Sequence, residues 1–169
     1  ENTEKDLIDS PWVQRLRRIY QLQSARWVYP SAEHTRFQHS LGTMHMAGEF
    51  GKHLYPSLKE VCNDAPSLNY VEELLRTAGL LHDVGHGPYG HFFDDNYLCR
   101  HDLTHEIMGQ LIITERLGGI ISRIERSPTG AFAGGEGLNP EEVAFLIRSP
   151  RGGRVKRPRW LQLLRQLFS

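Results

Sequence analysis

The histidines of this chain are concentrated in one stretch, and one of them stands directly beside an acid. Nine of the 169 residues are histidine, and seven of the nine lie between His34 and His91. Histidine binds transition metals and moves protons near neutral pH more readily than any other side chain. His82 is followed by Asp83. An imidazole and a carboxylate at the end of one helix can reach the same cation, so we expect the chemistry of the protein here.

Three predicted helices each direct an ionisable side chain toward the core. His82 ends the apolar stripe of a helix predicted over 71–82, and His39 lies near the start of an earlier helix. His105, which is followed by Glu106, lies near the start of a later one. A single such histidine is more often a hydrogen-bonded core residue than a ligand. Several together are costly to bury, and metal coordination is one common way to offset that cost.

The glycine-rich loop over 82–91 supplies two more imidazoles, those of His86 and His91. Its glycines allow the backbone to approach a ligand closely, and its proline stiffens the loop. Arg36 lies one helical turn before His39, near a helix N-terminus, where arginine readily contacts phosphate. Metal ligands, free imidazoles and an arginine together favour attack of a metal-activated water on phosphorus.

The elements that position these residues are predicted to be helices almost throughout. Ser10 followed by proline predicts a helix start, and Thr35 with Gln38 predicts a capping box. The helix opened by Thr35 is predicted to end before Pro56. Only the residues near 26–29 read as a short extended piece. The chain is therefore predicted to be all-α, a helical bundle with the metal site between helices.

The last third of the chain is also predicted to be largely helical. A helix is predicted from about Thr104 to Leu117, stopped by the following Gly-Gly pair. Residues 127–138 read as a surface loop, and a short helix is predicted to start at Asn139. The apolar stripe over 160–168 is too rich for a free tail, so we expect it to pack on the core or on a second chain.

Composition and charge exclude several classes of protein. Lysines and arginines number 20, as do aspartates and glutamates, which argues against a general polyanion-binding surface. The basic run over 151–159 leaves a local nucleic-acid contact as a weaker alternative. No apolar run approaches the ~18 residues of a membrane span, so no membrane partner is expected. The polar N-terminus is unlike a signal peptide, and Cys62 and Cys99 form no CxxC motif, which favours a cytoplasmic location.

Four strings occur here in a fixed order: HTRFQHSLG from His34, HDVGHGP from His82, HFFD from His91 and HE at His105. Together they resemble the HD-domain phosphohydrolases, in particular the deoxynucleoside triphosphate triphosphohydrolase branch. The resemblance covers about residues 10–117. It implies hydrolysis of dNTPs to deoxynucleoside and triphosphate by a protein that is commonly a homo-oligomer.

The resemblance also implies roles for individual residues. Three of the four metal ligands of the family match His39, His82 and Asp83. The phosphate contact and the catalytic groups match Arg36, His86, His91, Asp94, His105 and Glu106, with Asp94 and Glu106 as acids that orient or polarise an imidazole. Part of the nucleoside pocket matches Leu22 and Gln23. The cofactor is a divalent metal ion, and a mixed N/O ligand set leaves Fe, Mn, Zn and Mg open.

The fourth metal ligand of the family is an aspartate in a stretch of the form Asp-x-x-Asp-Tyr-x-x-Arg-Asp, which these 169 residues lack. In relatives this stretch follows soon after a segment like 163–169. We therefore expect residues 1–169 to be a single HD domain, truncated on its C-terminal side and weakly active. Two alternatives stay open: another nucleotidase or phosphodiesterase of the superfamily, and a non-catalytic nucleotide-binding module.

Overall fold

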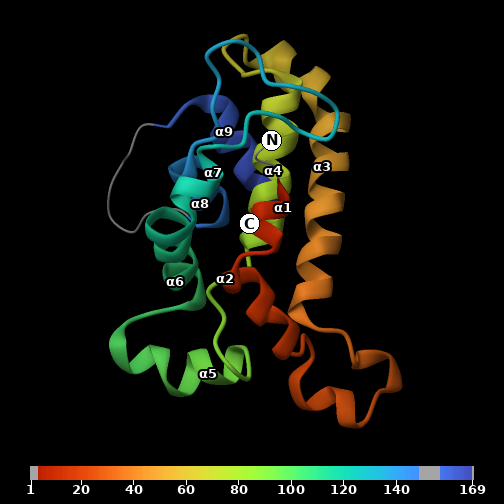
Figure 1. The fold of residues 1–169 in the computed structure, drawn as a ribbon, viewed down its shortest axis with the longest axis vertical. Helices are drawn as coiled ribbons and strands as arrows, with labels where there is room; N and C mark the ends of the chain where they lie inside the picture. Colours follow the sequence, from red (N-terminus) through yellow and green to blue (C-terminus); the bar gives the residue numbers. More distant parts are fainter. Residues whose placement is uncertain (1–3, 149–156, 169) are drawn as a thin grey trace.

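The structure, a computed structural model, describes residues 4–148 and 157–168 and is all-helical, as predicted (Figure 1). Its α-helices are α1 (Glu4–Ile8), α2 (Pro11–Gln14), α3 (Arg36–Val61), α4 (Leu68–Leu81), α5 (His91–Asn96), α6 (His105–Leu111), α7 (Gly118–Ile121), α8 (Pro140–Ile147) and α9 (Arg159–Arg165). Shorter 3₁₀ turns are η1 (Arg15–Arg18), η2 (Gln23–Trp27), η3 (Pro30–Ala32), η4 (Leu98–His101) and η6 (Gln166–Phe168), and η5 (Ile112–Leu117) is a short π-helix. Extended pairing in these residues is limited to two isolated bridges.

The frame of the fold is the antiparallel pair α3 and α4, which run side by side along the long axis (Figure 1). The two backbones approach closely at Gly79, where an added Cβ would lie 2.9 Å from the carbonyl oxygen of Thr43. Because the helices are antiparallel, the first turn of α3 lies beside the last turn of α4. This pairing brings His39 next to His82, although 43 residues separate them.

The start of α3 follows the sequence prediction, whereas its end does not. Thr35 and Gln38 form the predicted capping box. The helix then continues through Pro56 to Val61 instead of ending before the proline. Proline removes one backbone hydrogen bond, but the added turns are held by the buried side chain of Leu58 and by the hydrogen bond from Tyr55 Oη to the Pro66 carbonyl. Tertiary packing therefore outweighs the local cost of the proline.

The second layer consists of α6, η5, α7, α8 and α9, which cover one face of α4 (Figure 1). The predicted stop at the Gly-Gly pair is wrong, because α7 begins at Gly118 and extends the helical path to Ile121. Ile121 is fully buried, so its packing favours another helical turn. The shared core is formed by side chains such as Leu74, Ile113 and Leu146.

The predicted apolar stripe near the chain end joins this core. Trp160, Leu161 and Leu164 are buried, whereas Leu167 is 42% exposed. Of the extended piece predicted near 26–29, the first two residues end the 3₁₀ turn η2, and Tyr29 has extended backbone; Trp27 and Val28 are exposed. Most of the basic run over 151–159 lies outside the described residues. No helix in the described part of the chain is both long enough and apolar enough to cross a membrane.

Candidate metal centre

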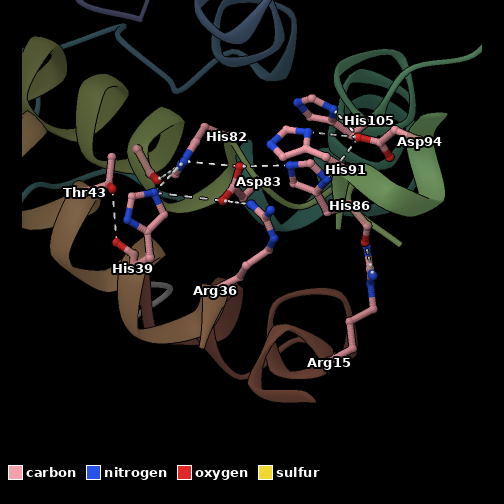
Figure 2. Close-up of polar contacts among 11 residues, drawn as sticks. Arg15, Arg36, His39, Thr43, His82, Asp83, His86, His91, Asp94 and His105 are labelled. Atoms are coloured by element: carbon pink, nitrogen blue, oxygen red, sulfur yellow. Dashed lines mark hydrogen bonds and ion pairs between the residues drawn. The ribbon is translucent and has the colours of Figure 1, made fainter. Parts of the chain in front are cut away.

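The first cluster of candidate ligands lies where α3 begins and α4 ends. His39 lies in the first turn of α3, His82 is the C-cap residue of α4, and Asp83 follows it. Figure 2 shows the three side chains pointing toward one another. One ligand atom from each lies within 4.8 Å of the other two. Helix pairing thus collects three separate donors at one point.

The distances within this cluster suit a single cation. His39 Nε2 lies 3.2 Å from His82 Nε2, and the nearest Asp83 oxygens lie 3.4 Å from His82 Nε2 and 3.9 Å from His39 Nε2. Metal–ligand bonds of about 2.0–2.2 Å at tetrahedral angles separate ligand atoms by about 3.3–3.6 Å. The residues present therefore fit a divalent ion that favours nitrogen and oxygen ligands.

The hydrogen bonding of His82 leaves its coordinating nitrogen free. His82 Nδ1 lies 2.7 Å from the carbonyl oxygen of Gly79, an acceptor, so Nδ1 carries the proton and donates it there. Nε2 then presents its lone pair to His39. Burial, and then the neighbouring His82, lower the pKa of His39. Both effects favour the neutral imidazole that a metal requires.

Asp83 is held as a carboxylate by a buried arginine. Arg36 Nη1 donates to Asp83 Oδ2 at 2.6 Å, and only 2% and 9% of the two side chains are exposed. Burial alone would raise the pKa of Asp83, but His82 and Arg36 together lower it below its ordinary value. The Nε atom of Arg36 is buried and has no hydrogen-bond partner. Arg36 therefore retains a donor beside the metal ligands for an anionic group.

A second cluster surrounds Asp94, in the first turn of α5 (Figure 2). Its Oδ2 atom lies 2.7 Å from His105 Nδ1, 3.3 Å from His86 Nδ1 and 3.5 Å from His91 Nδ1. The rings of His86 and His105 stack with centroids 3.9 Å apart. His86 Nε2 also lies 3.5 Å from Asp83 Oδ1, so His86 connects the two clusters. Burial, and then Arg36, lower the pKa of His86 to about 3, which keeps this imidazole neutral.

The loop between the clusters is fixed by two contacts across the fold. An added Cβ on Gly85 would lie 1.8 Å from the carbonyl oxygen of His105, so only glycine allows α6 to approach this closely. The Arg15 guanidinium donates to the carbonyl oxygens of His86, at 2.6 Å, and of Val84. Sequence reasoning missed Arg15, because its partners are main-chain carbonyls far along the chain and leave no local pattern.

Glu106 is the predicted site residue that the structure places outside both clusters. Its side chain is 43% exposed, accepts from Thr104 Oγ1 at 3.1 Å and lies 3.7 Å from Arg148 Nε. Successive residues on a helix point about 100° apart, so Glu106 turns away when His105 turns inward. Glu106 therefore lies outside both clusters, contrary to the expectation that it orients an imidazole. Among the described carboxylates, Asp94 contacts all three rings of the second cluster, and Asp83 contacts His86.

A pocket of about 670 Å³ lies beside the loop that carries His86 and His91, because Pro88 and Tyr89 of this loop line it. Gly90, at φ +54°, lies between Arg36 and Gln23 of the pocket wall: an added Cβ would lie 2.9 Å from Arg36 Nη2 and 3.1 Å from Gln23 Nε2. Leu22, expected beside Gln23, is exposed and not part of the pocket wall. The wall is rich in aromatic and basic side chains, and it also contains the amide of Gln23; the aromatic and basic residues are Arg18, Tyr20, Arg26, Trp27, Tyr89 and Phe92.

A helical bundle that joins a His-Asp pair from one helix end to a histidine of the adjoining helix defines the HD domain. The family model of the HD domain matches residues 36–156, and the chain belongs to this family.

The chain is also similar to several curated proteins. The chain is 35% identical over 159 residues to the deoxynucleoside triphosphate triphosphohydrolase SAMHD1 of Bos taurus, covering 90% of this chain and 25% of that protein. It is 36% identical over 162 residues to SAMHD1 of Homo sapiens, covering 90% and 23%. It is 39% identical over 110 residues to the uncharacterized protein MJ1154 of Methanocaldococcus jannaschii, covering 65% and 20%. The chain thus spans about a quarter or less of the length of these curated relatives.

Proposed function

We propose that this protein is a metal-dependent phosphohydrolase that converts dNTPs to deoxynucleoside and triphosphate. The observation that carries the proposal is the meeting of three metal ligands, a buried arginine and a histidine-rich cluster within one short region. His39, His82 and Asp83 face one point, Arg36 contacts Asp83, and His86 extends the site toward Asp94. The similarity to proteins named as triphosphohydrolases supports the choice of substrate.

The ion held by His39, His82 and Asp83 would supply Lewis acidity at a phosphate oxygen and lower the pKa of a water. Iron, manganese, zinc and magnesium all remain compatible with two imidazoles and one carboxylate. Arg36 keeps Asp83 ionised and offers its unpartnered Nε to the phosphates. Charge-assisted hydrogen bonds of this kind orient a phosphoryl group as well as attract it.

His91 and His105 are the candidates for proton transfer. His105 Nδ1 donates to Asp94 Oδ2 at 2.7 Å, which fixes the ring and leaves Nε2 on its opposite side. Attack of water on the α-phosphorus breaks the bond from that phosphorus to the 5′ oxygen of the deoxyribose. The leaving oxygen takes a proton from Nε2 of the doubly protonated imidazolium, the proton released by the attacking water restores that imidazolium, and the products are a deoxynucleoside and intact triphosphate.

The pocket beside Arg36 suits the nucleoside part of the substrate. Trp27, Tyr89 and Phe92 offer aromatic faces for a base, and Gln23 offers an amide at the boundary with Arg36. A nucleotide placed this way has its base in the pocket and its phosphates at the two clusters. The arrangement therefore accounts for both ends of a dNTP.

Product analysis tests the proposal. The chain, supplied with Mn²⁺, is incubated separately with each of the four dNTPs, and the products are separated by anion-exchange chromatography. We expect deoxynucleoside and triphosphate in equal amounts, and loss of both with EDTA or in His82→Ala. A longer form carrying the distal aspartate of the family motif is expected to turn over faster. Release of only monophosphate or phosphate would support the nucleotidase alternative, and no turnover by either form with metal bound would support a binding module.

A further inference from the structure

Helix α1 lies against α4 (Figure 1) and is held there by an arginine that faces two acids. The Arg76 guanidinium donates to both carboxylate oxygens of Glu4, from Nε and, at 2.9 Å, from Nη2. Arg76 Nε also lies 4.0 Å from Oε2 of Glu73, on its own helix. The side chains of Glu4 and Arg76 are 18% and 14% exposed, and that of Glu73 is fully buried. One guanidinium thus faces two carboxyl groups that are largely shielded from water.

The surroundings of Glu73 leave one of its oxygens unsatisfied. The groups that act on Glu73 are Glu4 from α1 and, from its own helix, Arg76 and Thr77, whose hydroxyl donates to Glu73 Oε1 at 3.3 Å. Glu73 Oε2 has no hydrogen-bond partner in the described part of the chain. Helix α7, which also packs against α1, contains only glycine and isoleucine, and α3 presents Gly48 to the stem of Arg76. If both acids were ionised, a second negative charge would stay buried beside an unsatisfied oxygen, which is costly.

The other charged residues of these helices near the arginine are exposed or have a partner of their own. Lys5 and Asp6 of α1 and Glu49 of α3 are exposed, and Glu72 accepts from Ser127 Oγ at 2.7 Å.

A single proton resolves the conflict between the two acids. When one carboxyl is protonated, it donates to the other, the excess negative charge disappears and the unsatisfied oxygen gains a partner. Two carboxyl groups that share a site do not both ionise at the ordinary pH. Burial, and then Glu4, raise the pKa of Glu73, in agreement with a proton held between them.

We propose that Glu4 and Glu73 share one proton, and that this proton latches α1 onto α4, so that the N-terminal segment is released more readily as pH rises. Lifting α1 opens Glu73 to water, where its pKa returns to the ordinary value of 4.5 and the proton leaves to solvent. Loss of one proton per opening raises the opening equilibrium about tenfold for each pH unit between that value and the pKa of the docked state. The latch has its full strength below pH 4.5 and weakens as pH rises.

The latched segment also carries an arginine that supports the metal centre. Gln14 Nε2 donates to the carbonyl oxygen of Ile8 at 2.8 Å, which ties α2 to α1. Arg15 follows directly and donates to the carbonyl oxygens of His86 and Val84. The latch therefore acts on the same segment that holds the turn after α4.

Amide hydrogen exchange tests the latch. It needs neither metal nor nucleotide, so the inference goes beyond the proposed function and its outcome is independent of it. Exchange rates at the Asp9, Ser10 and Gln14 amides, which are hydrogen-bonded within the segment, are measured from about pH 6 to pH 9 and divided by the intrinsic rates. In the wild type we expect this protection to fall by up to about tenfold per pH unit. Glu73→Gln, which keeps the shape but carries no titrating proton, should show constant protection.

Matched variants keep the test decisive. Asp6→Asn removes an exposed acid of α1 and should keep the pH dependence of the wild type. Glu4→Gln carries the test if Glu73→Gln does not fold, because Arg76 can then neutralise the one remaining acid and the pH dependence should shrink.

Three results would overturn the latch. The first is wild-type protection that does not change with pH, and the second is an equal pH dependence in Glu73→Gln. The third is exchange of the segment amides only together with those of α4, at the same opening free energy, because the segment would then open by global unfolding alone.

Discussion

The Arg15 guanidinium lies 2.6 Å from the carbonyl oxygen of His86 and also donates to that of Val84. Both carbonyls belong to the turn that follows α4, and this turn carries Asp83 and His86. An arginine at the C-terminal end of a helix also meets the negative end of the helix dipole. Arg15 thus ties the N-terminal segment to the backbone that positions members of both clusters.

Removing this contact is expected to weaken metal binding without removing a ligand. In Arg15→Ala the two carbonyls lose a charged donor, and the loop that carries Asp83 gains freedom. We expect affinity for Co²⁺ to fall about 10-fold or more, as it does when groups behind metal ligands are lost. Equilibrium titration of the metal-free protein measures the change. Arg15→Lys keeps the charge but not the fork of donors, so it should recover only part of the affinity.

The matched control for this variant is Arg123→Ala, which removes an exposed arginine. It should leave Co²⁺ affinity unchanged. If Arg15→Ala lowers the unfolding temperature but leaves affinity at the wild-type value, Arg15 stabilises the fold and does not position the site.

Local signals predicted the parts of this fold that depend on neighbouring residues. The hydroxyl of Thr35 and the amide of Gln38 form a capping box by themselves, so the start of α3 could be read from four residues. The end of α3 could not be predicted from the local sequence. The burial of Leu58 and the hydrogen bond of Tyr55 offset the helix-breaking effect of Pro56. Helix ends held by tertiary packing leave little trace in the local sequence.

The candidate site likewise contains residues whose positions local sequence patterns predict and residues whose positions depend on tertiary packing. The order and spacing of histidines pointed to His39 and His82, since helical periodicity places both on inward faces. The central position of Asp94 could not be predicted from periodicity, because it depends on how the loop over 82–91 folds back against α6. The outward direction of Glu106 follows from its one-residue step from His105, a signal that was present in the sequence.

Gly85 is expected to be far less replaceable than other glycines of the chain. In Gly85→Ala the new methyl group would overlap the carbonyl oxygen of His105, 1.8 Å away, and the backbone nitrogen of Gly109, 2.4 Å away. Backbone cannot move aside as a side chain can, so we expect a loss of at least about 3 kcal/mol or failure to fold. Gly119→Ala is the control, since nothing lies within 4 Å of its Cβ, and it should gain up to about 1 kcal/mol. Urea unfolding of both variants measures the difference, and equal stabilities would refute the close approach of α6 to the loop.

Glu73 is expected to make the protein less stable as pH rises. Its side chain is fully buried, its Oε2 atom has no hydrogen-bond partner, and Arg76 Nε is 4.0 Å away. Burial, and then the nearby Glu4, raise the pKa of Glu73 well above its ordinary value of 4.5. The folded protein therefore holds a proton that the unfolded chain releases above pH 4.5. Stability due to this proton is fully present below that pH and is lost as pH rises toward the folded-state pKa.

Glu73→Gln removes this proton linkage while keeping the shape of the side chain. We expect the variant to be more stable than the wild type at pH 8 by about 1–3 kcal/mol, and the two to converge near pH 5. Urea unfolding at a series of pH values measures the free energy of unfolding of both proteins. Taking the difference at each pH cancels the contribution of the other titrating groups. Glu60→Gln, at an exposed position, should show no pH-dependent difference from the wild type. A Glu73→Gln variant that is less stable at every pH would mean that Glu73 is ionised and paired.

If the Asp94 cluster transfers protons, substituting its histidines should lower turnover while the ion at His39, His82 and Asp83 stays bound. His105 contacts Asp94 at 2.7 Å and has 21% of its side chain exposed, which gives it both an orienting partner and access to substrate. If His105 protonates the leaving 5′ oxygen, His105→Ala should lower kcat by about 10²–10⁴, the range of general acid catalysis, with little change in KM. His91→Ala should have a smaller effect, because its ring is 60% exposed and 3.5 Å from the same oxygen. Steady-state kinetics on dNTPs, with Co²⁺ counted in the same samples, checks both.

Two outcomes would change these assignments. If kcat falls only in samples that have also lost the ion bound by His82, these histidines serve metal retention. If His91→Ala has the larger effect on kcat, His91 supplies the proton.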